Sequence, residues 1–112
     1  MAEEEKELPG PYEIFELADG ETRQLKVTRY ETGRVTIYPA HKPTGKVIQA
    51  LRVYVPEDTK EHYPYYWDIT SKTLVAQLLP QLEAGRFESK VFIVTKHGVA
   101  PKARFTLEVR RG

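Results

Sequence analysis

The chain has no cysteine among its 112 residues, which excludes disulfides, cysteine-based zinc sites and thiol catalysis. It also has no asparagine and only one methionine, while 29% of its residues are charged. Such depletion of thermolabile residues is typical of proteins from thermophiles. No apolar run approaches the roughly 20 residues that a transmembrane helix needs, and the first residues, MAEEEKEL, lack the order of a secretory signal. We therefore expect a cytoplasmic thermophile protein without membrane contact.

Charge is nearly balanced overall but unevenly distributed along the chain. The net charge is +1, and eight of the sixteen acidic residues lie within the first 21 positions, so the remainder is basic. A grossly basic protein is excluded, and nucleic-acid binding would need a local patch. The length and the 40% hydrophobic content predict a single folded domain. We expect a flexible acidic tail at 1–11 and one domain at 12–112.

Alternating apolar residues predict strands in the middle and at the end of the chain. Leucine and valine at helical spacing predict a helix that begins at Thr70 or Ser71. Pro80 should end or kink this helix, or start a short turn that closes at Gly85. The predicted strands are 12–18, 22–31, 34–39, 46–55, 90–96 and 103–110, with a turn at Thr32–Gly33.

The order of these elements predicts the fold class. Without the first strand the order is strand, strand, strand, helix, strand, strand, which matches the OB-fold. Other small barrels and α+β sandwiches share this order. We expect an all-β domain with one helix: a five-stranded OB-like Greek-key barrel, with the helix between strands 3 and 4 and an extra N-terminal strand.

Lysine, arginine and tyrosine residues share the side of the predicted sheet that faces away from the core. Aromatic rings stack on nucleobases, with about 1–3 kcal/mol per base, and Lys and Arg neutralise phosphates. We therefore predict binding of single-stranded nucleic acid, DNA in preference to RNA, with little sequence specificity. The predicted site comprises Lys26, Arg34, Tyr38, Arg52 and Tyr54, together with Lys96, Lys102 and Arg104 at the tip of the last hairpin.

The last hairpin, VFIVTKHGVAPKARFTLEV, resembles the closing hairpin of small single-stranded-DNA-binding proteins of phages and archaeal elements. A helix-like segment precedes it, as in that family, and the resemblance covers only the C-terminal half of the chain. It implies an OB-fold and DNA binding. Many members carry an acidic C-terminal tail, whereas the acidic segment here comes first. The matching residues are Thr95, Lys96, Gly98, Lys102, Arg104, Phe105, Glu108 and Val109.

The stretch HYPYYWDI, residues 62–69, is the densest aromatic cluster of the chain. Tyr63 and Tyr65 are candidates for a flexible stacking loop. Alternatively, the stretch closes the open end of the barrel, with Tyr66 and Trp67 filling the core. Because Tyr and Trp are enriched at binding hot spots, a second hypothesis is a protein–protein interaction barrel, a subunit or adaptor that uses residues 62–67. The sequence is also compatible with a homo-oligomer.

Nothing in the sequence indicates an enzyme. His41, His62 and His97 stand at no metal-ligand spacing, and Gly45–Lys46 lacks the context of a phosphate-binding loop. No order of Ser, His and Asp suggests a nucleophilic triad. We therefore expect a binding protein without catalytic residues, metal or cofactor.

Overall fold

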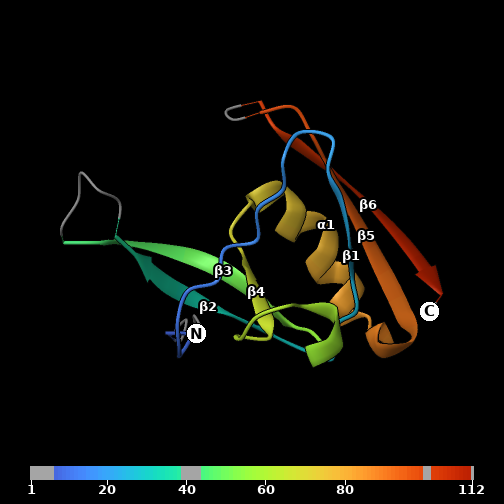
Figure 1. The fold of residues 1–112 in the computed structure, drawn as a ribbon, viewed down its shortest axis with the longest axis horizontal. Coiled ribbons are helices and arrows are strands. Elements are labelled where there is room, and N and C mark those ends of the chain that lie inside the picture. The colour runs from blue at the N-terminus through green and yellow to red at the C-terminus, as the bar shows by residue number, and fades with distance from the viewer. Residues whose placement is uncertain (1–6, 39–43, 100–101, 112) are drawn as a thin grey trace.

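A computed structural model describes residues 7–38, 44–99 and 102–111. Most of the expected tail (1–6), position 39 of a predicted strand, and His41 lie outside the described residues. The described part forms six strands, one α-helix and two short 3-10 helices (Figure 1). In chain order they are β1 (Thr22–Leu25), β2 (Arg29–Ile37), β3 (Lys46–Tyr54), η1 (Glu57–Thr59), β4 (Tyr66–Ile69), α1 (Lys72–Glu83), η2 (Phe87–Ser89), β5 (Lys90–His97) and β6 (Arg104–Arg111).

The strands form two antiparallel three-stranded sheets, ordered β1-β5-β6 and β2-β3-β4. β5 is the central strand of the first sheet, and β3 is the central strand of the second. Helix α1 lies between the two sheets (Figure 1). Buried residues from both sheets and from α1 join in one main hydrophobic core.

The expected OB-like barrel is wrong. The strands of the described residues make two separate sheets and no closed barrel, and the helix follows the fourth strand instead of the third. The predicted strand 22–31 is in fact two strands in different sheets, because the chain bends at 26–28 with Val27 buried. β4 lies in the stretch that we expected to be an aromatic loop, since pairing with β3 decides its conformation.

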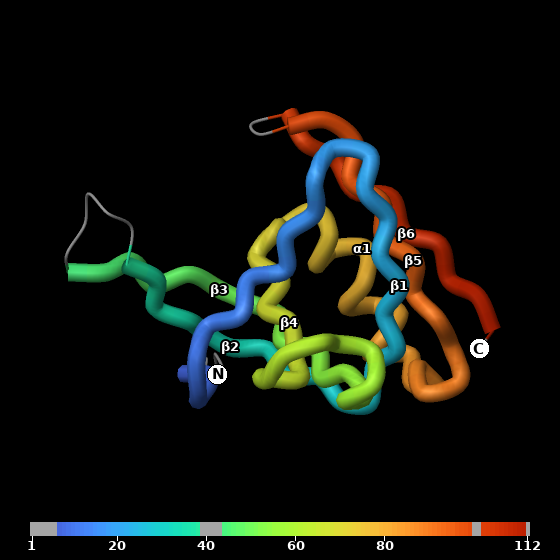
Figure 2. The backbone as a smooth tube through the Cα atoms, in the orientation of Figure 1, coloured from blue at the N-terminus to red at the C-terminus, as the bar shows by residue number. Residues whose placement is uncertain are grey.

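The predicted turn at Thr32–Gly33 is also wrong. Both residues lie inside β2, where Gly33 is buried opposite Ala50. β2 and β3 pair over nine residues, from Arg29↔Tyr54 to Ile37↔Lys46. This hairpin extends past the end of β4, as the tube in Figure 2 shows. We call its distal part, residues 32–38 and 44–50, the arm.

Helix α1 forms where its leucine spacing predicts. Ser71 is the N-cap, and its hydroxyl accepts a hydrogen bond from the Leu74 N–H at 3.4 Å. Leu74, Leu78 and Leu82 are at most 1% exposed. Their spacing places them on one face of the helix, and this face packs into the core between the sheets.

Pro80 does not end the helix, which continues to Glu83. Proline removes only its own N–H from the helical ladder, and the extra turn places Leu82 in the core. Gly85 closes helix α1 itself and not a separate short turn that starts at Pro80. Gly85 has a φ of 82° and donates its N–H to the Leu82 carbonyl at 3.1 Å.

Residues 7–17 cross the β2-β3-β4 sheet without forming the predicted strand at 12–18. They make two isolated parallel bridges, from Glu7 to β2 and from Ile14 to β4. Leu8 is 5% exposed and packs with buried residues of β2 and β3 in a second small core. Residues 7–11, which we assigned to the tail, therefore contact the folded domain.

Candidate binding groove

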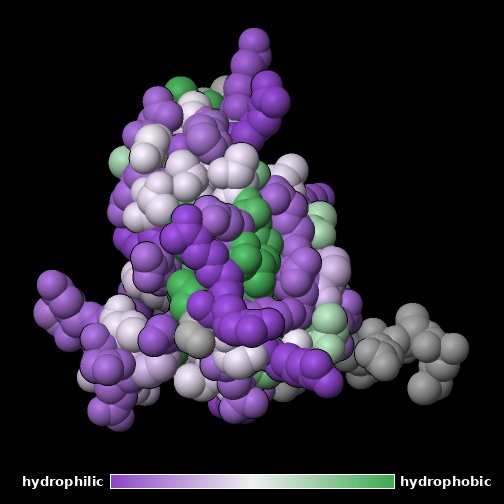
Figure 3. All heavy atoms as spheres, turned by 90° about the vertical axis from the view of Figure 1, so that its right-hand side faces the viewer, coloured by the Kyte–Doolittle hydropathy of each residue, from purple (hydrophilic) through white to green (hydrophobic). Residues whose placement is uncertain are grey.

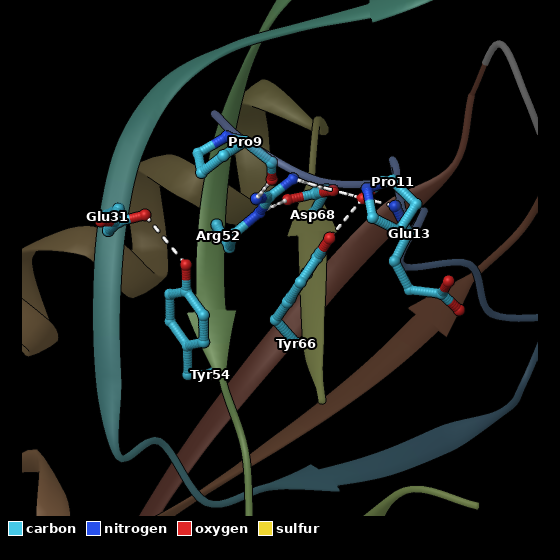
Figure 4. Close-up of polar contacts among 8 residues, drawn as sticks. All are labelled: Pro9, Pro11, Glu13, Glu31, Arg52, Tyr54, Tyr66 and Asp68. Carbon is cyan, nitrogen blue, oxygen red and sulfur yellow. Dashed lines mark hydrogen bonds and ion pairs between the residues drawn. The ribbon is translucent and has the colours of Figure 1, made fainter. Parts of the chain in front are cut away.

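Arg52, expected on the outer face of the sheet, is buried with 1% of its surface exposed. It forms a bidentate ion pair with Asp68, its partner on β4: Nε lies 2.6 Å from Oδ1 and Nη2 lies 3.0 Å from Oδ2 (Figure 4). The guanidinium also donates to the carbonyls of Pro9 and Pro11. Arg52 therefore holds residues 7–14 against the sheet and is not available to contact phosphate.

The partners of this ion pair complete a closed polar cluster (Figure 4). The Asp68 carboxylate accepts the Glu13 N–H at 2.9 Å, and the Tyr66 hydroxyl donates to the Pro11 carbonyl. The Arg52 guanidinium carbon lies 3.9 Å from the centroid of the Tyr66 ring. Among the described residues no buried side-chain nitrogen or oxygen lacks a hydrogen-bond partner. The cluster is saturated, which fits a structural role.

The electrostatics of the cluster are those of a stable ion pair. Burial alone lowers the pKa of Arg52, but the hydrogen bond and the charge of Asp68 outweigh burial, so the pKa of Arg52 is raised. Burial raises the pKa of Tyr66. Both shifts preserve the ordinary protonation state at neutral pH.

Tyr38 and Tyr54 lie on opposite faces of the β2-β3-β4 sheet. Tyr54 is half-buried on the face of Arg52, and its hydroxyl donates to Glu31 Oε2 at 3.0 Å (Figure 4). The Arg29 guanidinium carbon lies 4.0 Å from the centroid of its ring. Tyr38 follows the last residue of β2 and lies on the side of Thr36, since the side chains of both approach Gly45; it is 71% exposed at the end of the arm. The two rings therefore cannot form one stacking surface.

The other basic residues of the predicted nucleic-acid site lie in separate regions of the structure. Arg34 is exposed on the arm, and Lys26 is exposed at the bend after β1. The β5–β6 hairpin, which extends from the body in a different direction from the arm (Figure 1), carries half-buried Lys96 and exposed Lys102 and Arg104. The face on the right-hand side of Figure 1, toward β5 and β6, is mainly hydrophilic, with a small apolar area in its middle (Figure 3).

The aromatic stretch 62–69 is divided between core and surface. Tyr66 is 7% exposed, and half-buried Trp67 packs edge-on against Phe15 with ring centroids 5.8 Å apart. Tyr63 is 75% exposed and meets half-buried Tyr65 edge to face at 6.0 Å. These two tyrosines contact each other and do not form an open stacking loop with the other predicted residues.

A groove that we did not predict lies between the arm and helix α1. Its volume is about 930 Å³, within the usual range of about 300–1,000 Å³ for ligand sites. We call it the arm–helix groove. It is lined by Thr32, Gly33, Ile37, Lys46, Val47, Ile48, Gln49, Ala50, Leu51, Thr70, Lys72, Val75, Ala76 and Leu79.

The lining of this groove is aliphatic and cationic. Eight of its fourteen residues are Ala, Val, Leu or Ile, and the charged ones are Lys46 and Lys72. Among the described residues that line it there is no aromatic and no acidic side chain. Val47 is an apolar residue with 56% of its surface exposed. Val75 and Leu79 flank the buried leucines of α1. Both are half-buried and pack against the main core, and both also line the groove.

A second, smaller cavity of about 350 Å³ lies beside Trp67. Its lining carries both charge signs, and these groups already contact one another, since Lys60 Nζ lies 3.2 Å from Glu13 Oε1. Lys60 Nζ also lies 4.6 Å from the centroid of the Trp67 ring. The arm–helix groove is therefore the stronger candidate for a binding site.

Two other classes of site receive no support from the described residues. They contain no group of three or more His, Asp or Glu side chains placed to hold a metal ion. The described part also contains no helix that is long and apolar enough to span a membrane.

Comparison with known proteins adds no evidence on function: no family model matches the chain, and no curated protein or solved structure is significantly similar to it.

Proposed function

We propose that this chain is a protein-binding module that holds an apolar segment of a partner protein in the arm–helix groove. The observation that carries this proposal is the lining of the groove, with exposed Val47 on one side and half-buried Val75 and Leu79 on the other. Covering an aliphatic groove removes apolar surface from water, at about 25 cal/mol per Å². The lining of the groove supports it, and not residues 62–67, as the site that a subunit or adaptor would use in this proposal.

The hypothesis of single-stranded nucleic-acid binding depended on Tyr38, Arg52 and Tyr54 projecting together to solvent. Arg52 is buried, and the two tyrosines lie on opposite faces. Nucleobases favour aromatic stacking surfaces, whereas the groove is aliphatic. The geometry therefore favours a protein partner, and nucleic-acid binding becomes the alternative outcome of the same experiments.

The proposal is tested by selection from a displayed library of random 12-residue peptides on the immobilised full chain. Enriched peptides are then titrated against two variants, Ala76→Glu and Thr73→Glu. Both residues are exposed on α1, but only Ala76 lines the groove. We expect Ala76→Glu to weaken binding at least tenfold and Thr73→Glu to leave it unchanged, with thermal unfolding unaltered in both.

Two results would overturn the proposal. The first is a selection that enriches no peptide, or only peptides that are indifferent to Ala76→Glu. The second is tight binding of fluorescent oligo-dT that competes with the enriched peptides and weakens steeply with salt. That second result would assign the groove to nucleic acid instead.

A further inference from the structure

One edge of β3 is only partly paired. Its edge toward β2 is paired over the full strand, from Lys46 to Tyr54. Its other edge pairs with β4 only at Leu51–Tyr54, because the chain leaves the sheet at Thr70 to start helix α1. In the described part of the chain no strand pairs with this edge along residues 46–50.

The hydrogen bonds of β3 show which backbone groups point to the open edge. The Val55 N–H donates to the Tyr65 carbonyl at 3.1 Å, toward β4, whereas the Tyr54 carbonyl accepts the Thr28 N–H at 2.9 Å, toward β2. Backbone direction alternates along a strand, and the register with β2 is continuous. The N–H and C=O groups of Val47 and Gln49 therefore point away from β2, toward the open edge.

The open edge faces the groove. Six consecutive residues, Lys46 to Leu51, line the arm–helix groove. Side chains of a strand alternate between two faces, so a consecutive run indicates that the backbone of β3 lines the groove together with its side chains. The groove thus combines a strand edge that no described strand covers with apolar residues of α1.

We propose that the partner segment is an extended strand that pairs with the open edge of β3 and continues the sheet beyond the end of β4. This rests on the proposed function and names the partner's conformation and chemistry. Main-chain hydrogen bonds to Val47 and Gln49 hold the segment, and its alternate side chains contact Val75 and Leu79, as in strand addition generally.

Charge complementarity assigns acidic residues to the partner strand. Lys46 on the arm and Lys72 on α1 line the groove without an acidic neighbour among its described lining residues. A second copy of this chain would bring the same lysines together, and like charges at close range are unfavourable. We therefore infer a partner strand in which apolar residues alternate with polar residues, among them Asp or Glu.

Two variants at position 49 test this inference, with the peptides that the selection enriches as ligands. The Gln49 N–H points away from β2, so Gln49→Pro removes a donor from the open edge and leaves the β2–β3 ladder intact. Gln49→Ala is the matched control. We expect Gln49→Pro to weaken binding about tenfold more than Gln49→Ala does, with similar melting temperatures.

Hydrogen exchange of the wild-type chain supplies a measurement that does not depend on a variant. Peptide binding should slow exchange of the Val47 and Gln49 amides, and the enriched sequences should alternate apolar and acidic residues. Peptides that depend on Ala76 but leave these amides unprotected and ignore Gln49→Pro would overturn the inference while retaining the proposed function. A concentration-dependent dimer that protects the same amides would assign the edge to a second copy and overturn the acidic partner.

Discussion

The buried ion pair between Arg52 and Asp68 makes the sharpest prediction for stability. Replacing Asp68 by alanine leaves the guanidinium buried without its counter-charge and also removes the acceptor of the Glu13 N–H. Breaking a buried pair from one side costs about 3–5 kcal/mol. We expect Asp68→Ala and Arg52→Met each to lower the free energy of unfolding by about that amount.

The double variant Arg52→Met/Asp68→Ala, which combines the two single replacements, distinguishes the energy of the pair from the energies of the separate charges. It leaves no uncompensated charge in the site, so its cost should fall well below the sum of the single costs. Arg52→Lys keeps the charge but loses the bidentate geometry, and its cost should be intermediate. All four variants are compared by urea unfolding, followed by far-UV circular dichroism and Trp67 fluorescence.

Two outcomes would refute this reasoning. If each single variant lowers the free energy of unfolding by less than about 1 kcal/mol, the site behaves like a solvated surface pair. If the double variant costs the full sum of the single variants, the two side chains stabilise the fold independently. Proteolysis near Pro9 and Pro11 gives a local check, because loss of Arg52 should release these residues before the core unfolds.

Two further predictions concern the core and the acid limb of the stability curve. Leu78→Ala should lower the free energy of unfolding by about 2–5 kcal/mol, because Leu78 is 0% exposed between the two sheets; a loss below 1 kcal/mol in urea unfolding would contradict the packing. The Ala18 N–H donates to Glu21, and this bond, with help from Arg23, lowers the pKa of Glu21 from its ordinary 4.5. A lowered folded-state pKa contributes stability above the unfolded pKa that is lost as pH falls through the folded pKa. Glu21→Gln should therefore flatten the acid limb of the stability–pH curve, and NMR titration should place the Glu21 midpoint below 4.5; a midpoint at or above that value would exclude this contribution.

The spacing of apolar residues correctly predicted the helix and strands that have one apolar and one polar face. The prediction of 46–55 matches β3, that of 90–96 matches β5, and that of 103–110 matches β6 to within one residue at each end. The predicted helix also formed, with its buried leucines where spacing placed them. In each of these segments the apolar pattern follows the core face of one element, so local information was sufficient.

The failures come from contacts that no local pattern encodes. The alternation of apolar and polar residues continues through Leu25 and Val27, so the sequence pattern does not indicate that the chain passes from one sheet to the other there. Alternation also placed Arg52 correctly on the face opposite Leu51 and Val53. The error was to assume that this opposite face meets solvent, when residues 7–14 cover it.

The candidate groove was hidden for a related reason. It lies where the arm extends past the end of β4 and where residues of α1 line its other side. Both facts depend on strand length and helix position, which a single sequence specifies poorly. The apolar face of the helix carried no separate signal, because Val75 and Leu79 beside the buried leucines make the ordinary stripe of a helix that packs on one core.

The path of residues 7–14 also fixes where this domain can be cut. A shortened chain that starts at Tyr12 would lack the two proline carbonyls that receive the Arg52 guanidinium, and it would uncover the surface that Leu8 now shields. Fusions and deletions should therefore leave everything from Glu7 onward in place, because the folding unit starts well before its first strand.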